Sequence, residues 1–219
     1  MRTQLYSHEY DEITNIANLV IAKYVKSYPL DIDELMASIK TIRFMTYSEY
    51  GVDDRHKCFE MSETGYSYKC GNRMFVVYND QVPDTCRMYS VLHELGHLGD
   101  EHAAKRELFF DDLCARYEID AVLPDELSGE AGEEYKALCE RQEKAANYFA
   151  DVLAAPNWLI DKIKPEIPWD LCEILDIGYT CAEMRWRSYR RWVRLGKPRV
   201  SPVEAYNARM IVLHREGRM

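Results

Sequence analysis

The sequence predicts a predominantly helical α+β protein with a small β-sheet. Several long stretches repeat apolar residues three and four positions apart, which is the spacing that gives a helix one apolar face. Residues 41–46 alternate in polarity and residues 73–78 follow a Gly71–Asn72 turn, so both segments favour strands. At 219 residues and 47% hydrophobic content, the chain can bury a core of its own.

The first part of the chain is expected to hold the sheet and two helices. Proline cannot continue a helix, so an amphipathic helix over 10–26 is expected to stop before Pro29. Asp31 and Glu34 have the spacing of a capping box for a short second helix. The expected strands are 41–46, a hairpin of 57–60 with 66–69, and 73–78.

The remainder is expected to be helical, apart from an acidic stretch over 118–134. The predicted helices begin at about 85, run over 103–117 and 133–154, resume after Pro156, and end with one that starts at Pro202. We expect a first domain over 1–156 and a helical C-terminal extension over 157–219.

The segment His93-Glu94-Leu95-Gly96-His97 is an HExxH motif inside one of these helices. Histidines four residues apart share a helical face, so both imidazoles can reach one zinc ion. Glu94 is not needed as a ligand and can take a proton from water at the metal. The motif therefore predicts metal-assisted hydrolysis of an amide. Gly96 costs the helix about 1 kcal/mol relative to Ala, which a close backbone approach would explain.

A catalytic zinc usually has three protein ligands, so a third one is expected outside the motif. Glu143 is the first candidate, because it shares a helical face with Asn147. Glu140, one turn earlier, and His102 are the alternatives. Small residues would let the second helix pack closely against the first, namely Ala145, Ala146 and Ala150.

Three segments resemble the ImmA/IrrE family of metallo-endopeptidases, over roughly residues 9–156. They are 29–35, 74–80 and the Glu-x-x-x-Asn-Tyr-Phe-Ala stretch of 143–150. The resemblance implies a zincin-like pair of active-site helices on the sheet, with Glu143 as the third zinc ligand. It implies, as substrate, a helix-turn-helix repressor of a phage or mobile element. The spacer between His97 and Glu143 is long for the family.

Two further roles follow from this zincin-like reading. In zincins the strand before the active-site helix often pairs with the substrate backbone, so Met74, Val76 and Tyr78 are expected to bind the substrate. The group that stabilises the oxyanion is not identified by the sequence. The unranked candidates are Tyr89, His102 and Tyr148.

Composition favours a cytoplasmic enzyme. No apolar run approaches the 18 or more residues of a membrane span, and residues 1–6 lack the apolar core of a signal peptide, so no membrane partner is expected. The seven cysteines are scattered without a paired CxxC, which predicts reduced thiols.

Positive charge is concentrated in residues 185–199, although the whole chain has a net charge of −9. Such asymmetry can mark a contact with nucleic acid. The alternative is a helix whose basic face packs near the acidic body, with the aromatic residues of the segment in the core. Two other functional classes therefore stay open: a DNA-binding regulator and an anti-repressor that binds without cleaving.

Overall fold

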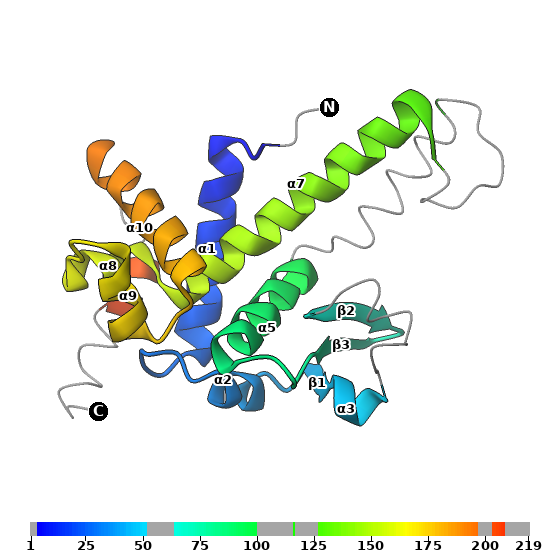
Figure 1. The fold of residues 1–219 in the computed structure, drawn as a ribbon, viewed down its shortest axis with the longest axis horizontal. Coiled ribbons are helices and arrows are strands. Elements are labelled where there is room, and N and C mark those ends of the chain that lie inside the picture. The colour runs from blue at the N-terminus through cyan, green and yellow to red at the C-terminus, as the bar shows by residue number, and fades with distance from the viewer. Residues whose placement is uncertain (1–3, 52–63, 100–115, 117–126, 197–202, 209–219) are drawn as a thin grey trace.

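The computed structural model describes residues 4–51, 64–99, 116, 127–196 and 203–208. The helices are α1 (Ser7–Tyr24), α2 (Ile32–Ser38), α3 (Tyr47–Tyr50), α5 (Asp84–Gly99), α7 (Gly129–Ala154), α8 (Asn157–Ile163), α9 (Pro168–Leu175) and α10 (Tyr179–Arg194). The strands are β1 (Ile42–Thr46), β2 (Gly65–Cys70) and β3 (Arg73–Tyr78). The predicted fold class, predominantly helical α+β with a small sheet, is confirmed (Figure 1).

Within the residues that the structure describes, the sheet has three strands in the order β1-β3-β2. β1 runs parallel to β3, and β2 runs antiparallel to it across a two-residue turn. Gly71 in that turn has φ 58°, a left-handed conformation that glycine adopts without strain. The segment 66–69 is a strand as predicted, but its hairpin partner among the described residues is β3. The expected partner at 57–60 lies outside the described residues.

Capping residues explain where two short helices begin. Asp31 accepts a hydrogen bond from the Glu34 backbone N–H at 2.9 Å and begins α2 as predicted. Thr46 and Glu49 form a reciprocal capping box, with bonds of 2.8 and 3.0 Å, that ends β1 and begins α3. The short helix α3 was not predicted. The helix expected over 103–117 lies outside the described residues, apart from position 116.

α5 lies between the sheet and α7 (Figure 1). One face of α5 contacts β2 and β3, and its other side packs along α7, which in turn packs on α1. Solvent does not reach the core between these elements, because Leu92, Val76 and Ala150 are fully buried. The sheet and two long helices therefore hold α5 on both sides.

The C-terminal helices share this core. Arg185 of α10 is fully buried and donates hydrogen bonds to the Ala155 carbonyl at 2.8 Å and to Asn157 at 2.9 Å. Trp158 of α8 reaches Asn18 of α1 at 3.4 Å. Position 156, the expected domain boundary, therefore lies inside a continuous core. Among the helices that the structure describes, none is both long and apolar enough to span a membrane.

Candidate metal centre

α5 places His93 and His97 one turn apart on the side that faces α7. Their ring centroids are 4.6 Å apart, and the two Nε2 atoms are 2.9 Å apart. Both nitrogens therefore point to one place between the two helices. The four-residue spacing and the helix predicted from the sequence give this arrangement.

α7 brings a carboxylate to the same place. The Oε2 atom of Glu143 lies 3.2 Å from Nε2 of His93, and its Oε1 atom lies 3.4 Å from Nε2 of His97. Ligands of a tetrahedral zinc site, each about 2.0–2.2 Å from the ion, are separated by roughly 3.3 Å. The three side chains thus have the spacing and the N₂O donor set of a metal centre.

A close approach of the two helices makes this convergence possible. A Cβ atom built on Gly96 would lie 2.9 Å from the Ala146 Cα and 3.1 Å from its carbonyl oxygen. Real Cβ atoms do not come this close to backbone, so any larger residue at position 96 would push α5 and α7 apart. Both the glycine and the small residue opposite were predicted from the sequence to serve this contact.

Glu94 lies beside the histidines and faces β2. Its side chain is 6% exposed, and a Cβ atom on Gly65 of β2 would be 3.5 Å from its Cγ. His93, Glu94 and His97 each offer a ligand atom, and these atoms lie within 4.8 Å of one another, so this group can hold a metal ion. Two carboxylates, Glu94 and Glu143, therefore flank the pair of imidazoles from different elements.

The charges in the site favour metal binding. Burial lowers the pKa of the His93 imidazole, but its hydrogen bond to the Glu143 carboxylate and the nearby charges of Glu94 and Glu143 outweigh burial and raise this pKa. Hydrogen bonds from His93 and His97 hold the pKa of the Glu143 carboxyl far below its usual range. Glu143 is therefore an ionised carboxylate at neutral pH, which is the form that binds a cation.

Asn147, one turn after Glu143, holds the far side of the His93 ring. Its Oδ1 atom lies 3.0 Å from Nδ1 of His93 and 3.2 Å from the hydroxyl of Tyr89. The sequence placed Asn147 on the same helical face as Glu143 but did not identify this contact. Its spacing of four residues from a candidate ligand indicates the shared face, but the contact itself depends on how α7 passes His93.

Three of the other candidates, Glu140, Tyr148 and Tyr89, do not reach this place. Glu140 is exposed and, within the described part of the chain, pairs with neither histidine. The Tyr148 hydroxyl lies 3.2 Å from Thr14 of α1, on another side of α7. The Tyr89 hydroxyl faces Asn147 instead of the space between the two Nε2 atoms. His102 lies outside the described residues.

The strand that was predicted to bind the substrate is not an edge strand. Met74, Val76 and Tyr78 lie on β3, whose backbone pairs with β1 on one side and with β2 on the other. A central strand has no free edge, so the prediction that β3 docks the substrate is wrong. The strand order could not be read from the local pattern. The outer strand nearest Glu94 is β2, through Gly65.

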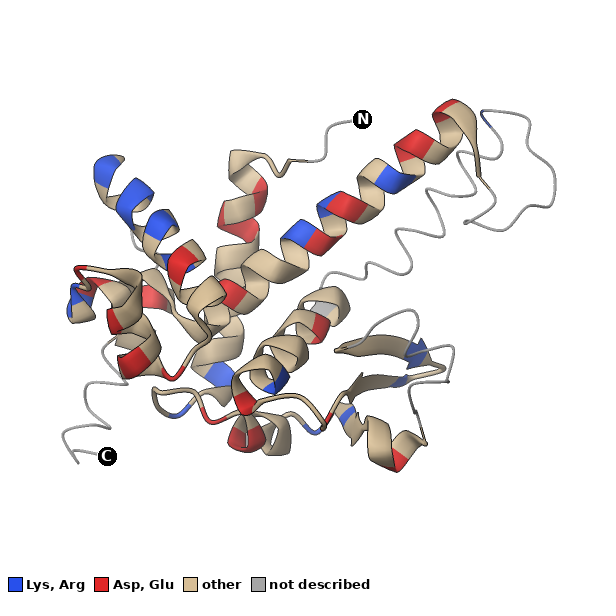
Figure 2. Ribbon diagram, in the orientation of Figure 1, with Lys and Arg blue, Asp and Glu red and all other residues tan. Residues whose placement is uncertain are grey.

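The basic segment divides into buried and exposed parts. Arg185 belongs to the basic segment but is fully buried. Arg187 forms an ion pair of 2.7 Å with Glu183. Arg190, Arg191 and Arg194 in the outer half of α10 are also exposed. Figure 2 shows the Lys and Arg colour repeating along this part of α10. Trp186 and Tyr189 pack partly against the core, as expected.

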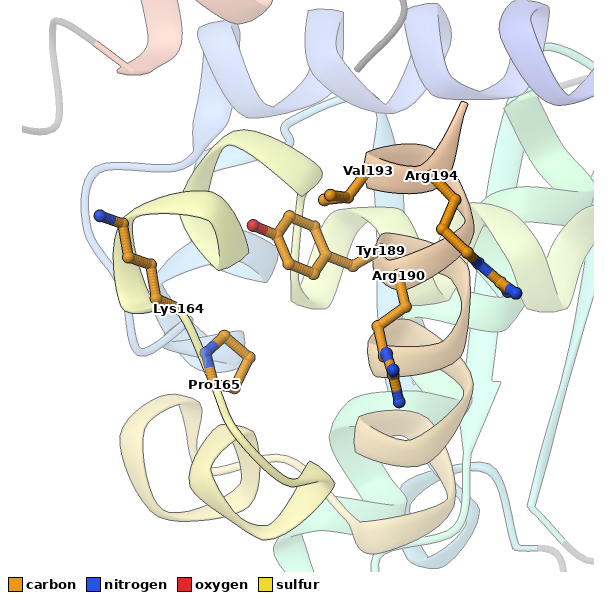
Figure 3. A pocket seen from close by; sticks show the side chains of 6 residues that line it. All are labelled: Lys164, Pro165, Tyr189, Arg190, Val193 and Arg194. Carbon is orange, nitrogen blue, oxygen red and sulfur yellow. The ribbon is translucent and has the colours of Figure 1, made fainter. Parts of the chain in front are cut away.

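A hollow of about 370 Å³ lies between α10 and the loop after α8, away from the histidines. Figure 3 shows its lining side chains: Lys164, Pro165, Tyr189, Arg190, Val193 and Arg194. The charged ends of Lys164 and Arg194 point to different sides and do not converge on the hollow (Figure 3). A binding site usually has polar groups that converge, so we assign no ligand to this hollow.

Comparison with known proteins adds no further identification. No protein-family model and no curated protein matches the chain.

Proposed function

We propose that the chain is a zinc-dependent endopeptidase with His93, His97 and Glu143 as the metal ligands. One observation carries the proposal: the two Nε2 atoms and the Glu143 carboxylate lie 2.9 to 3.4 Å apart, with Glu94 beside them. Glu143 is preferred to Glu94 as the third ligand because its two oxygens each face one imidazole. Glu94 is then left for acid–base chemistry, in agreement with the ImmA/IrrE-like motifs.

Glu94 has the position of a general base. A bound zinc would polarise the scissile carbonyl and lower the pKa of water toward about 7. Glu94 takes the proton of the attacking water on one of its carboxylate oxygens and later delivers it to the leaving amine. Its burial between α5 and β2 keeps the carboxylate in place beside the histidines.

β2 is the strand from which a substrate would be held near Glu94. The Asn79 N–H donates a hydrogen bond to the Thr64 carbonyl at 2.9 Å. Backbone groups face the partner strand at every second residue, so those of residues 64 and 66 face β3. The N–H and C=O of Ser67 consequently point away from β3, where an extended peptide can pair with them. The expected substrate class, from the resemblance, is a helix-turn-helix repressor.

The proposal is tested with peptides derived from a bacterial proteome, incubated with the purified zinc-loaded protein. New peptide termini are identified by mass spectrometry. Wild-type protein should cleave, whereas Glu94→Gln should keep zinc and lose at least about 100-fold in rate, because general-base catalysis contributes roughly 10²–10⁴-fold. Glu140→Gln, the same change at an exposed position of α7, is the control and should cleave normally.

Cleavage by Glu94→Gln at the wild-type rate would show that Glu94 has another role. If the wild-type protein with bound zinc cleaves neither these peptides nor a repressor encoded beside it, the peptidase proposal fails. Binding to that repressor without cleavage would then favour an anti-repressor, and a shift of generic DNA in a gel would favour a DNA-binding regulator.

A further inference from the structure

A row of polar side chains lies between α5 and α7 and extends beyond the proposed metal ligands. On α5 its members are four residues apart: His97, His93 and Tyr89. On α7 they are also four residues apart: Glu143, Asn147 and Asp151. Glu143 contacts His97, near the end of α5. Asn147, one turn later in α7, contacts His93 and Tyr89, which lie earlier in α5. The two helices therefore run antiparallel here.

Asn147 determines which ring nitrogen of His93 carries a proton. The Oδ1 atom of Asn147 has no hydrogen, so it can only accept bonds from the His93 Nδ1–H at 3.0 Å and from the Tyr89 hydroxyl at 3.2 Å. When Nε2 of His93 gives up the proton that it donates to Glu143 in order to bind a metal, the remaining proton of the imidazole is therefore on Nδ1. Its Nε2 lone pair is left toward Glu143 and His97, which is the orientation a metal requires.

Tyr89 holds Asn147 in this position. The ring of Tyr89 packs partly buried against the hydrophobic core, so its hydroxyl cannot move far. Burial, together with the charges of Asp151 and Cys181, raises the pKa of the Tyr89 phenol, so the hydroxyl stays a donor over the physiological range. The same hydroxyl also lies 3.5 Å from the Asn147 backbone carbonyl.

We propose that Tyr89 is a positioning residue for the metal centre, acting through Asn147 on the ring of His93. This inference rests on the proposed metal centre. Without the Tyr89 hydroxyl, the Asn147 amide loses the donor that orients its oxygen, and His93 loses a fixed partner for Nδ1. Removing such an outer partner of a ligating histidine typically weakens metal affinity by 10- to 100-fold.

The test compares Tyr89→Phe with Tyr148→Phe. Both changes remove one tyrosine hydroxyl, but the hydroxyl of Tyr148 lies 3.2 Å from Thr14, away from the histidines. Zinc affinity is measured by competition with a chelator of known affinity. We expect Tyr89→Phe to bind zinc roughly 10-fold more weakly, and Tyr148→Phe to bind it as wild type does.

A double-mutant cycle then tests whether Tyr89 acts through Asn147. Asn147→Ala should weaken zinc binding, and Tyr89→Phe should have no further effect in that background. A second readout is the exchange with water of the His93 Nδ1 proton, followed by ¹⁵N NMR of the metal-free protein. Tyr89→Phe should speed up this exchange and leave the thermal unfolding of the metal-free protein close to that of Tyr148→Phe.

The outcomes separate the two proposals. If the wild-type chain does not bind zinc, the proposed metal centre fails. If wild type binds zinc and Tyr89→Phe binds it equally well, the metal centre stands and the role of Tyr89 is wrong. Additive losses in the cycle, or a loss of affinity that merely follows a loss of thermal stability, would likewise overturn the positioning role.

Discussion

At the residue scale, Glu143 and Glu140 offer a matched comparison on one helix. Both are exposed acidic residues of α7, but among the described residues Glu143 alone of the two contacts His93 and His97. We expect Glu143→Ala to weaken zinc binding severely and Glu140→Ala to leave it unchanged. Zinc affinity by chelator competition measures both. The reverse order of effects would move the third ligand one turn along α7.

Asp151 is a second residue with a measurable consequence. Burial raises the pKa of its carboxyl to about 6, against an ordinary value of 3.8, and the lowering effects of Arg185 and Cys181 do not offset it. The folded protein therefore binds this proton more tightly than the unfolded chain does. Above pH 6 ionisation of Asp151 lowers the free energy of unfolding, by up to about 3 kcal/mol, and the loss disappears as the pH falls toward 4.

Asp151→Asn removes this ionisation and should stabilise the protein at neutral pH. The free energy of unfolding in urea, measured from pH 4 to pH 7.5, should exceed that of wild type by about 1–3 kcal/mol at pH 7.5. The advantage should shrink steadily between pH 6 and pH 4. A difference between the two proteins that does not change with pH would show that the charge of Asp151 is compensated in the folded state.

Local spacing predicted the residues that converge, but it did not predict those that depend on tertiary context. His93, Glu94 and His97 follow from the helical period alone. Predicting the contact of Asn147 with His93 required knowing that α7 passes on the Nδ1 side of His93. Arg185 was counted in a basic segment over 185–199, and nothing in a run of arginines shows which one is turned inward. Its burial beside Ala155 and Asn157 is a property of the packed helices.

At the element scale, the sheet order changes which strand can bind a peptide. The segments that form β1, β2 and β3 were predicted from turns and alternation, and α3 was missed although Thr46-x-x-Glu49 is a capping-box pattern. The order β1-β3-β2 joins residues far apart in sequence, which local patterns do not encode. As a consequence β3 is central, and β2 replaces it as the candidate docking strand.

Ser67→Pro tests the docking role of β2. Proline removes the N–H that points away from β3, while the bonds of residues 64 and 66 toward β3 remain. We expect cleavage of the peptides to fall at least about tenfold, with zinc affinity and thermal unfolding unchanged. Tyr66→Pro is the control: it removes an N–H that faces β3 and should destabilise the strand itself. Unchanged cleavage by Ser67→Pro would exclude this edge as the docking site.

At the scale of the whole molecule, the C-terminal helices belong to the same core as α5 and α7. Residues 152–155 at the end of α7 are at most 1% exposed, and α10 reaches them through the bond of Arg185 to the Ala155 carbonyl. The boundary expected after residue 156 therefore cuts through packed side chains. The expected boundary coincides with the end of the resemblance at Pro156, and a resemblance over part of a chain does not show whether the parts pack together.

A chain that ends at residue 156 should consequently fail to fold. Removing α8, α9 and α10 exposes apolar surface that includes Leu153 and Phe149. We expect the truncated chain to lack cooperative thermal unfolding and to bind zinc far more weakly than the full chain. Circular dichroism and chelator competition measure these two properties. A folded fragment with wild-type zinc affinity would show that residues 1–156 form an independent domain.

The central claim is that one zinc ion sits between α5 and α7. X-ray diffraction from crystals of the purified protein, recorded on both sides of the zinc absorption edge, locates such an ion directly. We predict a single anomalous peak at roughly 2.0–2.2 Å from Nε2 of His93, Nε2 of His97 and a Glu143 oxygen. No peak between the two helices, or a zinc ion held by residues outside the HExxH motif, would contradict the proposed metal centre.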